Sequence, residues 1–119
     1  MRRLPFDGGG RDLRERLRAD VAAAGLSELD AGNLALAASE VLANAQRHGR
    51  GAPSLRTGGV DGSFVCEIAD EGPGMDDPLA GFLPPQDAHA GAGLWVARQL
   101  TRRLELLPAP QGLTVRLWV

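Results

Sequence analysis

The sequence predicts an α+β fold: a two-layer sandwich in which helices pack on one face of a mixed, mostly antiparallel sheet. Three segments carry apolar residues at helical spacing, and two pairs of alternating segments are each joined by a turn signal. The 119 residues contain no internal repeat, so we expect a single domain over residues 1–119. Helices mixed with antiparallel hairpins are typical of a layered α+β architecture.

The first part of the chain is expected to form a short edge strand over residues 3–6 and a helix over residues 11–24. Gly25 follows this helix and ends it. The apolar side of the helix consists of Leu13, Leu17, Val21 and Ala24.

A second helix is predicted from residue 28 to His48. Ser27 and Asp30 resemble a capping pair at its start, and Gly49 stands where a left-handed cap ends a helix. Its apolar stripe consists of Leu34, Ala38, Val41 and Ala45.

The first predicted hairpin pairs residues 54–60 with residues 63–69 around Asp61-Gly62, a strong turn signal. One face of its second strand should carry Phe64, Cys66 and Ile68, and the other face Val65, Glu67 and Ala69.

The rest of the chain should form a loop, a helix and a second hairpin. Residues 70–90 are rich in Gly, Pro and Asp, which indicates a long loop. A third helix is predicted over residues 91–104, followed by strands over residues 104–107 and 113–119.

Composition and charge exclude several classes of protein. The chain is 44% hydrophobic and 24% charged, as in ordinary globular domains. A net charge of −2 gives no basic field for direct nucleic-acid or lipid binding, and no apolar run could span a membrane.

The single cysteine, Cys66, cannot form an internal disulfide, so we expect a cytoplasmic protein with a buried structural thiol. All 13 cationic side chains are arginine, so a phosphate site here would use arginine, a metal ion or backbone amides.

Two polar residues stand beside the apolar stripe of the second helix. Glu40 and Asn44 are four residues apart, which makes them neighbours on one edge of the helix. For this pair alone two interpretations stay open, pocket-wall residues or an exposed pair without function. A carboxamide oxygen can bind Mg²⁺, and a carboxylate can orient or deprotonate a nucleophile.

Two glycine-containing segments extend this chemistry. Asp70 ends a strand and is followed by Gly72 and Gly74, so a carboxylate beside bare backbone could recognise an exocyclic amine. Gly91 and Gly93 open a helix, whose free N–H groups and positive dipole end suit an anion. Each motif alone is weak, but together they fit an adenine nucleotide with Mg²⁺.

The order of these motifs resembles the GHKL ATPase superfamily. They are E-x-x-x-N-x-x-x-H-G at residues 40–49, D-x-G-x-G at residues 70–74 and G-x-G-L at residues 91–94. Within the superfamily, the short length and the first motif most resemble the anti-sigma-factor serine/threonine kinases. The resemblance covers about residues 11–119 and implies a Bergerat-type ATP-binding fold.

The resemblance also implies a role for each matching position. Glu40 would be the catalytic base, Asn44 would ligate Mg²⁺, and Asp70 would bind the adenine amino group. Residues 75–90 would form the ATP lid. The other expected nucleotide-contacting residues are His48, Gly72, Gly74, Met75, Gly91, Ala92, Gly93 and Leu94.

The implied function is transfer of the γ-phosphate of ATP to a serine or threonine of a protein antagonist, and thereby control of a sigma factor. Three alternatives stay open: a non-catalytic nucleotide-dependent interaction switch, a detached histidine-kinase catalytic domain, and an interaction module with a decayed site. One departure matters for this choice. The lid contains no Arg or Lys, and His89 stands where these kinases carry a basic residue.

Two tryptophans bear on partners. Trp118 alternates with Leu117 and Val119, which places it on the sheet face that helices would leave open. Since tryptophan is enriched in interface hot spots, we expect this face to support a homodimer or a partner contact. Trp95 is expected to pack with Arg98 and Arg102 along the third helix.

Overall fold

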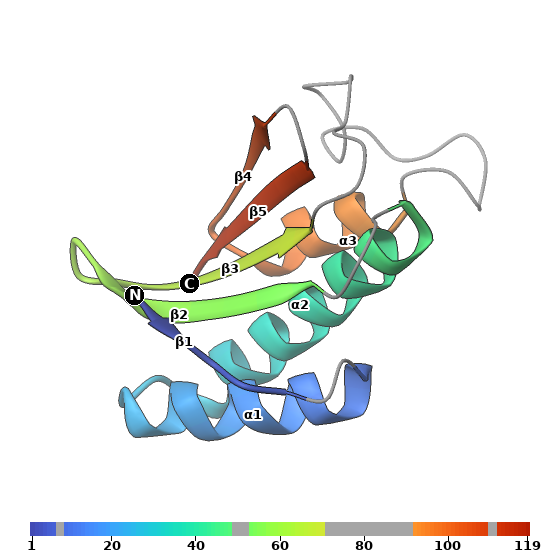
Figure 1. The fold of residues 1–119 in the computed structure, drawn as a ribbon. Coiled ribbons are helices and arrows are strands. Elements are labelled where there is room, and N and C mark those ends of the chain that lie inside the picture. The colour runs from blue at the N-terminus through green and yellow to red at the C-terminus, as the bar shows by residue number, and fades with distance from the viewer. Residues whose placement is uncertain (7–8, 49–52, 71–91, 110–111) are drawn as a thin grey trace.

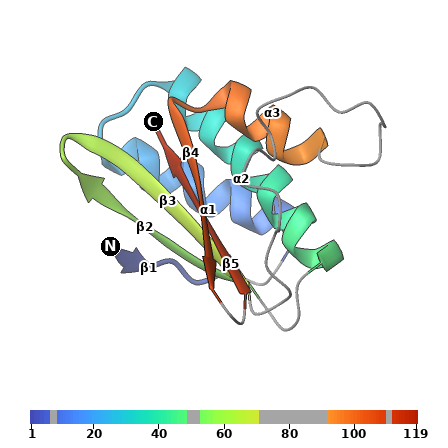
Figure 2. The ribbon, with the colours of Figure 1, turned by 90° about the horizontal axis from the view of Figure 1, so that it is seen from above.

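The computed structural model describes residues 1–6, 9–48, 53–70, 92–109 and 112–119. The helices in these ranges are α1 (Gly10–Ala23), α2 (Glu28–His48) and α3 (Ala92–Leu100). The strands are β1 (Arg2–Arg3), β2 (Ser54–Val60), β3 (Ser63–Asp70), β4 (Arg103–Ala109) and β5 (Gly112–Trp118). The three helices lie together on one face of the sheet, so the predicted two-layer α+β sandwich is confirmed (Figures 1 and 2).

The strands form one sheet in the order β1-β2-β3-β5-β4, and each of these pairings is antiparallel. β5 is therefore the last strand in the sequence but lies inside the sheet, between β3 and β4. The β2–β3 hairpin turns at Asp61 and Gly62, whose φ angles of 50° and 80° are those that a tight hairpin turn requires. The turn signal in the sequence thus located this hairpin correctly.

The start of α2 has the capping hydrogen bond that the sequence predicts. The hydroxyl of Ser27 accepts a hydrogen bond from the backbone N–H of Asp30, at 3.1 Å, which caps α2. α2 is the central helix of its layer and packs against both α1 and α3. No helix in the described ranges has both the length and the apolar character needed to cross a bilayer.

Two element ends differ from the sequence prediction. β1 covers Arg2–Arg3 rather than residues 3–6, because Leu4 already turns its side chain into the core while its N–H still bonds to Leu55. α3 ends at Leu100 rather than at residue 104. Leu104 fits the helical spacing, but it pairs with Leu117 as part of β4.

The early end of α3 also changes the surroundings of its tryptophan. Arg102 lies beyond the helix, and its backbone N–H bonds to the carbonyl of Trp118. Arg98 donates to the carbonyl of Leu104 at 3.2 Å, and burial lowers the pKa of this guanidinium. The expected helical row of Trp95, Arg98 and Arg102 is therefore wrong, because the row would need one more turn of helix.

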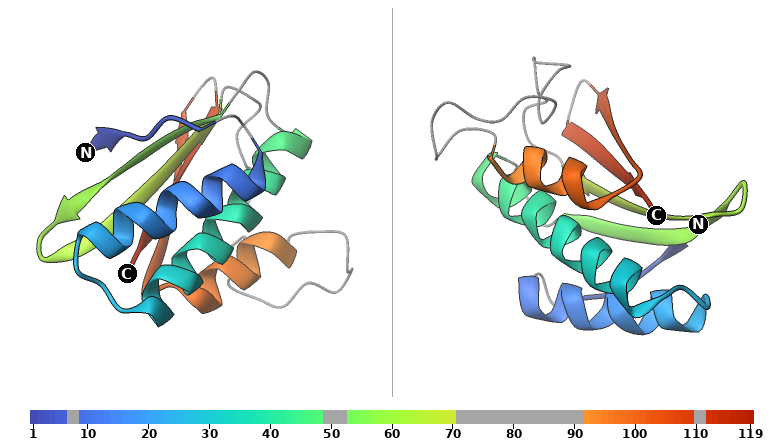
Figure 3. Two further views of the ribbon diagram at one scale, coloured as in Figure 1. Left: turned by 90° about the horizontal axis from the view of Figure 1, so that it is seen from below. Right: turned by 180° about the vertical axis from the view of Figure 1, so that it is seen from behind.

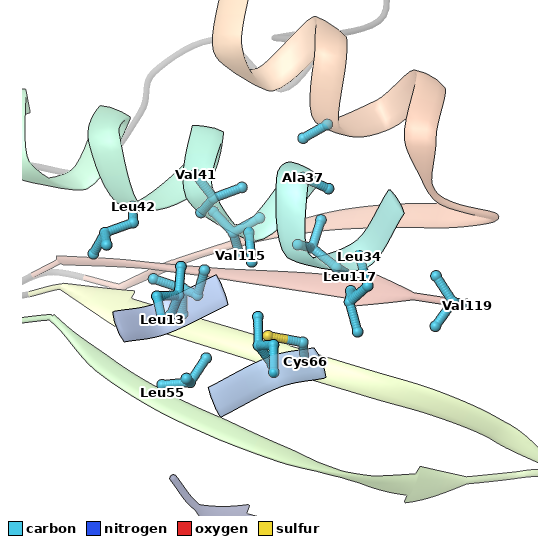
Figure 4. Close-up of a cluster of buried hydrophobic side chains, with 14 of the residues drawn as sticks. Leu13, Leu34, Ala37, Val41, Leu42, Leu55, Cys66, Val115, Leu117 and Val119 are labelled. Atoms are coloured by element: carbon cyan, nitrogen blue, oxygen red, sulfur yellow. The ribbon is translucent and has the colours of Figure 1, made fainter. Parts of the chain in front are cut away.

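The core lies between the two layers (Figure 4). All four residues of the predicted α2 stripe are buried, together with alternate residues of β5. The largest fully buried side chains of the helices and of the sheet meet here: Leu13, Leu17, Leu34, Leu42, Leu55, Ile68, Leu94 and Leu117. This apolar contact fixes α2 on the sheet and so determines which of its side chains remain at the edge.

The open face of the sheet carries a row of alternating charges. Arg56, Glu67, Arg116 and Glu105 are cross-strand neighbours in β2, β3, β5 and β4. Arg116 donates to Glu67 at 2.7 Å and covers it, which is why Glu67 is buried although it faces away from the helices. The two faces of β3 are therefore both buried, which alternation alone did not predict.

Asp20 joins α1 to the edge of the sheet. Its carboxylate accepts a hydrogen bond from the hydroxyl of the buried Thr57 in β2 and pairs with Arg2 in β1. One half-buried carboxylate thus holds three elements, and its hydrogen bonds compensate for its partial removal from water.

The buried thiol leads to the first prediction. Cys66 is fully buried, and burial, followed by the nearby carboxylates of Glu67 and Asp20, raises the pKa of its thiol. Since the thiolate is the reactive form, labelling of the native protein by a maleimide at pH 8 should be at least about 100-fold slower than in denaturant. Mass spectrometry against time measures both rates. Rapid labelling under native conditions would contradict the burial of this residue.

Candidate functional site

The candidate site begins on α2, where two polar side chains share the edge of the buried stripe. Asn44 is buried, with 8% of its surface exposed, and Glu40 is half-buried one turn before it. An exposed pair without function would not place an amide this deep, because burying a carboxamide costs free energy. The pair is therefore not an exposed one, and its place in the wall of a pocket stays a prediction.

Gly93 brings the start of α3 directly onto Glu40. A Cβ atom built on Gly93 would lie 3.2 Å from Oε2 of Glu40 and 3.3 Å from its backbone carbonyl oxygen. Both distances are shorter than most real Cβ contacts, so a side chain at position 93 would require Glu40 to shift by a few tenths of an ångström. The glycine here allows a close approach of the two helices.

The electrostatics of the first turn of α3 suit an anion. The first N–H groups of a helix have no partner within it and form the positive end of its dipole. α3 has no acidic residue in its own first turn, and the carboxylate that lies against this turn comes from Glu40 of α2. A group that binds to these amides would therefore lie beside the Glu40 carboxylate.

Asp70 is the last residue of β3 and lies on the same side of the molecule. It is half-buried and pairs with Leu113 of β5. Figures 1 and 3 show that β3 ends on the side where the second half of α2 and the beginning of α3 lie. Three segments that are far apart in the sequence thus meet at one end of the sandwich.

The predicted site residues can now be placed. Gly93 lies against Glu40, and Asn44 is buried one turn further along α2. Leu94 is fully buried, and Asp70 is the last residue of β3. His48 is the last residue of α2 and Ala92 is the first residue of α3, and the structure does not describe their side chains. The remaining predicted residues lie outside the described ranges: Gly72, Gly74, Met75 and Gly91, with the lid over residues 75–90.

The sequence did not reveal that Glu40 and Gly93 touch. Gly93 was expected only to offer a free amide. A signal was present in the sequence, because Gly93 comes just before Leu94 and Ala97 on the apolar side of α3. A residue without a side chain at such a position allows the helix to approach a neighbouring helix closely. The identity of that neighbour depended on the tertiary packing.

A separate open depression of about 800 Å³ lies at the other end of the sandwich, beside the β2–β3 hairpin. Its walls include Asp20, Thr57 and Phe64. The carboxylate of Asp20 is already occupied by Thr57 and Arg2, so the depression offers little unused polar chemistry. The candidate site is therefore the cluster at Glu40 and not this depression.

Comparisons with known proteins agree with the fold. A family described as the histidine kinase-like ATPase domain matches residues 10–119. No curated protein matches the chain. Among solved structures, the RsbU and RsbW domains of Rv1364c from Mycobacterium tuberculosis are similar, with a TM-score of 0.69 and 19% identity over 98% of this chain.

Two histidine kinase domains share the fold as well. The domain of the blue-light-activated kinase EL346 from Erythrobacter litoralis has a TM-score of 0.63 and 21% identity over 92% of this chain. That of the E. coli osmosensor EnvZ has a TM-score of 0.57 and 20% identity over 87%. This chain spans 30%, 59% and 83% of the Rv1364c, EL346 and EnvZ chains.

The tight contact at Gly93 predicts a difference between two glycine-to-alanine variants. Gly32 in α2 has no atom within 4 Å of a built Cβ, so Gly32→Ala should stabilise the protein by about 0.5–1 kcal/mol through helix propensity. Gly93→Ala should lose this gain, because its Cβ would meet the Glu40 backbone. Urea denaturation measures the free energy of unfolding of both variants and of the unchanged protein. An equal gain in the two variants would contradict the close approach of α3 to α2.

Proposed function

Since the chain belongs to the histidine kinase-like ATPase domain family, we propose that it binds ATP with Mg²⁺ and transfers the γ-phosphate to a protein. The proposed acceptor is a serine or threonine hydroxyl of an antagonist protein, and the proposed pathway controls a sigma factor. The family membership supports ATP as the nucleotide. The similarity to a chain that contains an RsbW domain lies in the fold.

One observation carries this proposal. The carboxylate of Glu40 lies against the first turn of α3 at Gly93, and Asn44 is buried one turn further along the same edge of α2. In the proposal, Glu40 is the proton acceptor, Asn44 is an oxygen ligand, and the first turn of α3 supplies backbone amides next to Glu40. Phosphoryl transfer depends mainly on such positioning, together with stabilisation of charge.

The residues present fit a magnesium ion that is shared with a nucleotide. Mg²⁺ usually takes only one or two ligands from the protein and the others from phosphate oxygens and water. No group of three His, Cys, Asp or Glu side chains gathers among the described residues, so a metal held by the protein alone is not supported there. The carboxamide oxygen of Asn44 would be the protein ligand, and the ion would offset the charge of the phosphates.

The proposed chemistry uses Glu40 as the base. The carboxylate accepts the proton of the acceptor hydroxyl while that oxygen forms a bond to the γ-phosphorus. The bond from the γ-phosphorus to the bridging oxygen breaks, and ADP leaves with the electron pair. The amides of the first turn of α3 hold the phosphate chain in place, and Asp70 hydrogen-bonds the amino group of adenine.

A non-catalytic switch is the second candidate, and a feature of the sequence favours it. Residues 75–90 contain neither Arg nor Lys to stabilise the charge that develops during transfer. In this alternative, ATP binds at the same residues but only changes the affinity for a partner protein.

Paired substitutions test the proposed roles. Asn44→Ala should weaken the binding of a fluorescent ATP analogue with Mg²⁺ by about tenfold or more, since it removes a metal ligand. Asn33→Ala, on the same helix, is the matched control and should change binding little. A fluorescence titration measures the affinities. No saturable binding by the unchanged protein would rule out both candidate functions.

Glu40→Gln separates the two candidates. This variant keeps the size of the side chain but cannot accept a proton, so transfer from labelled ATP to a candidate antagonist should fall at least about 100-fold while binding stays within about threefold. Glu15→Gln on the exposed side of α1 is the control. Equal transfer by the Glu40 variant would exclude the base assignment, and no transfer by either protein would favour the switch.

A further inference from the structure

The outer face of α2 exposes large apolar side chains next to the candidate site. Leu29 is 72% exposed and Leu36 is 46% exposed, and they lie two helical turns apart on the side that faces away from the sheet. Ala43 continues the same line at the next seven-residue step. We call Leu29, Gly32, Leu36 and Ala43 the outer α2 stripe. Two exposed leucines on one stripe indicate a contact surface more than scattered exposure does.

A groove runs beside this stripe, between α1 and α2. Near Gly32 it has a volume of about 440 Å³ and is lined by Arg18, Ala22, Leu26, Glu28, Ala31 and Gly32. Gly32 leaves space above it, because nothing lies within 4 Å of a built Cβ. The two helices lie next to each other in the layer (Figure 3). A hollow between two helices, beside a row of exposed leucines, is the kind of surface on which an amphipathic helix packs.

The α1 wall of the groove is positively charged. Arg11 and Arg16 of α1 pair with Glu15 and Asp12 on the same helix. Arg14 instead donates to the neutral hydroxyl of Ser39 at 3.3 Å. Neither Arg14 nor Arg18 takes part in an ion pair within the described part of the chain.

Only Glu28 opposes this charge in the groove, and it lies at the end beside Leu29. Arg18 lines the groove, and Arg14 contacts Ser39, which lies one turn from Leu36 on α2. Two cationic side chains of α1 therefore lie along one border of the outer α2 stripe. This combination is complementary to an amphipathic helix that carries apolar residues on one stripe and carboxylates along one border.

The position of the stripe connects it to the site. Leu36 and Glu40 are four residues apart on α2, so their side chains are neighbours on the helix surface. Glu40 in turn lies against Gly93 of α3. A partner helix that covered Leu36 would therefore lie close to the Glu40 carboxylate, which we propose as the base.

We propose that the outer α2 stripe, with Arg14 and Arg18, is the docking surface for an acidic amphipathic helix of the protein that accepts the phosphoryl group. Apolar residues of this helix pack on Leu29 and Leu36, and its carboxylates face the two arginines. The assignment of the occupant as the acceptor protein rests on the proposed function. The surface itself rests on exposure, shape and charge.

A synthetic peptide provides the probe. A fluorescein-labelled helical peptide of about 18 residues, or about 27 Å, carries leucines at i, i+3 and i+7 and glutamates along one border of that stripe. Its fluorescence anisotropy is titrated with the full chain in the absence of nucleotide. We expect saturable binding that weakens in about 0.5 M salt, and weaker binding of a matched peptide with lysine in place of glutamate.

Variants locate the binding surface. Leu36→Gln, and Arg14→Gln combined with Arg18→Gln, should each weaken binding of the glutamate peptide by about tenfold or more. Leu107→Gln and Arg102→Gln are matched controls, since both residues are exposed on other parts of the molecule and should leave binding unchanged. Thermal melting establishes that each variant is folded.

The outcomes separate the docking surface from the proposed function. No saturable binding of the glutamate peptide, or equal binding by all variants, overturns the docking surface even if the chain binds ATP. Loss of peptide binding by Leu36→Gln, with binding of the fluorescent ATP analogue kept, supports it. If the chain binds the peptide in the expected pattern but binds no ATP analogue, the surface stands and the acceptor assignment falls with the proposed function.

Discussion

The close approach of α3 to α2 at Gly93 is the constraint on which the site depends. Gly93 has no side chain between the two helices, and the atoms of α2 that lie nearest to this position are the carbonyl and carboxylate oxygens of Glu40. The same geometry brings the positive end of α3 to the polar edge of α2. A wider spacing would leave room for a side chain at position 93 but would separate the amides from Glu40 and Asn44.

α2 serves the core and the site at once, and this double role explains its composition. Its inner stripe consists of small and branched apolar residues that are all buried, while Glu40 and Asn44 occupy the border and Leu29 and Leu36 the outer side. Because the apolar packing fixes the rotation of the helix, it also fixes the direction of the polar pair. The packing of the core therefore contributes to the orientation of the candidate site.

Much of the fold could be predicted from the sequence, because it follows from local patterns. Ser27 and Asp30 marked the start of α2, and Asp61 and Gly62 marked the first hairpin. Leu104 shows the limit of such patterns, since its spacing fits a helix while its cross-strand partner Leu117 holds it in β4. The contact between Glu40 and Gly93 was also beyond local reasoning, because spacing within one segment says nothing about which segment packs against it.

Contacts on the open face of the sheet were likewise not predictable from local patterns. Trp118 was expected on this face and lies there, but its indole N–H donates to Glu105 at 2.8 Å, and Arg103 lies over its ring at 5.6 Å. Part of its surface is thus engaged within the chain. Whether this face supports a homodimer or another protein contact stays a prediction.

The order of the strands affects how the chain can fold while it is being synthesised. β5 leaves the ribosome after the four strands that precede it in the sequence, yet it lies inside the sheet, where it pairs with both β3 and β4. Until residues 112–119 emerge, the hydrogen-bonding edge of β3 remains unpaired and much of the apolar surface of the helices remains uncovered. The nascent chain must therefore complete its hydrophobic core after translation of these residues, and shielding of the β3 edge during that interval would favour correct folding over aggregation.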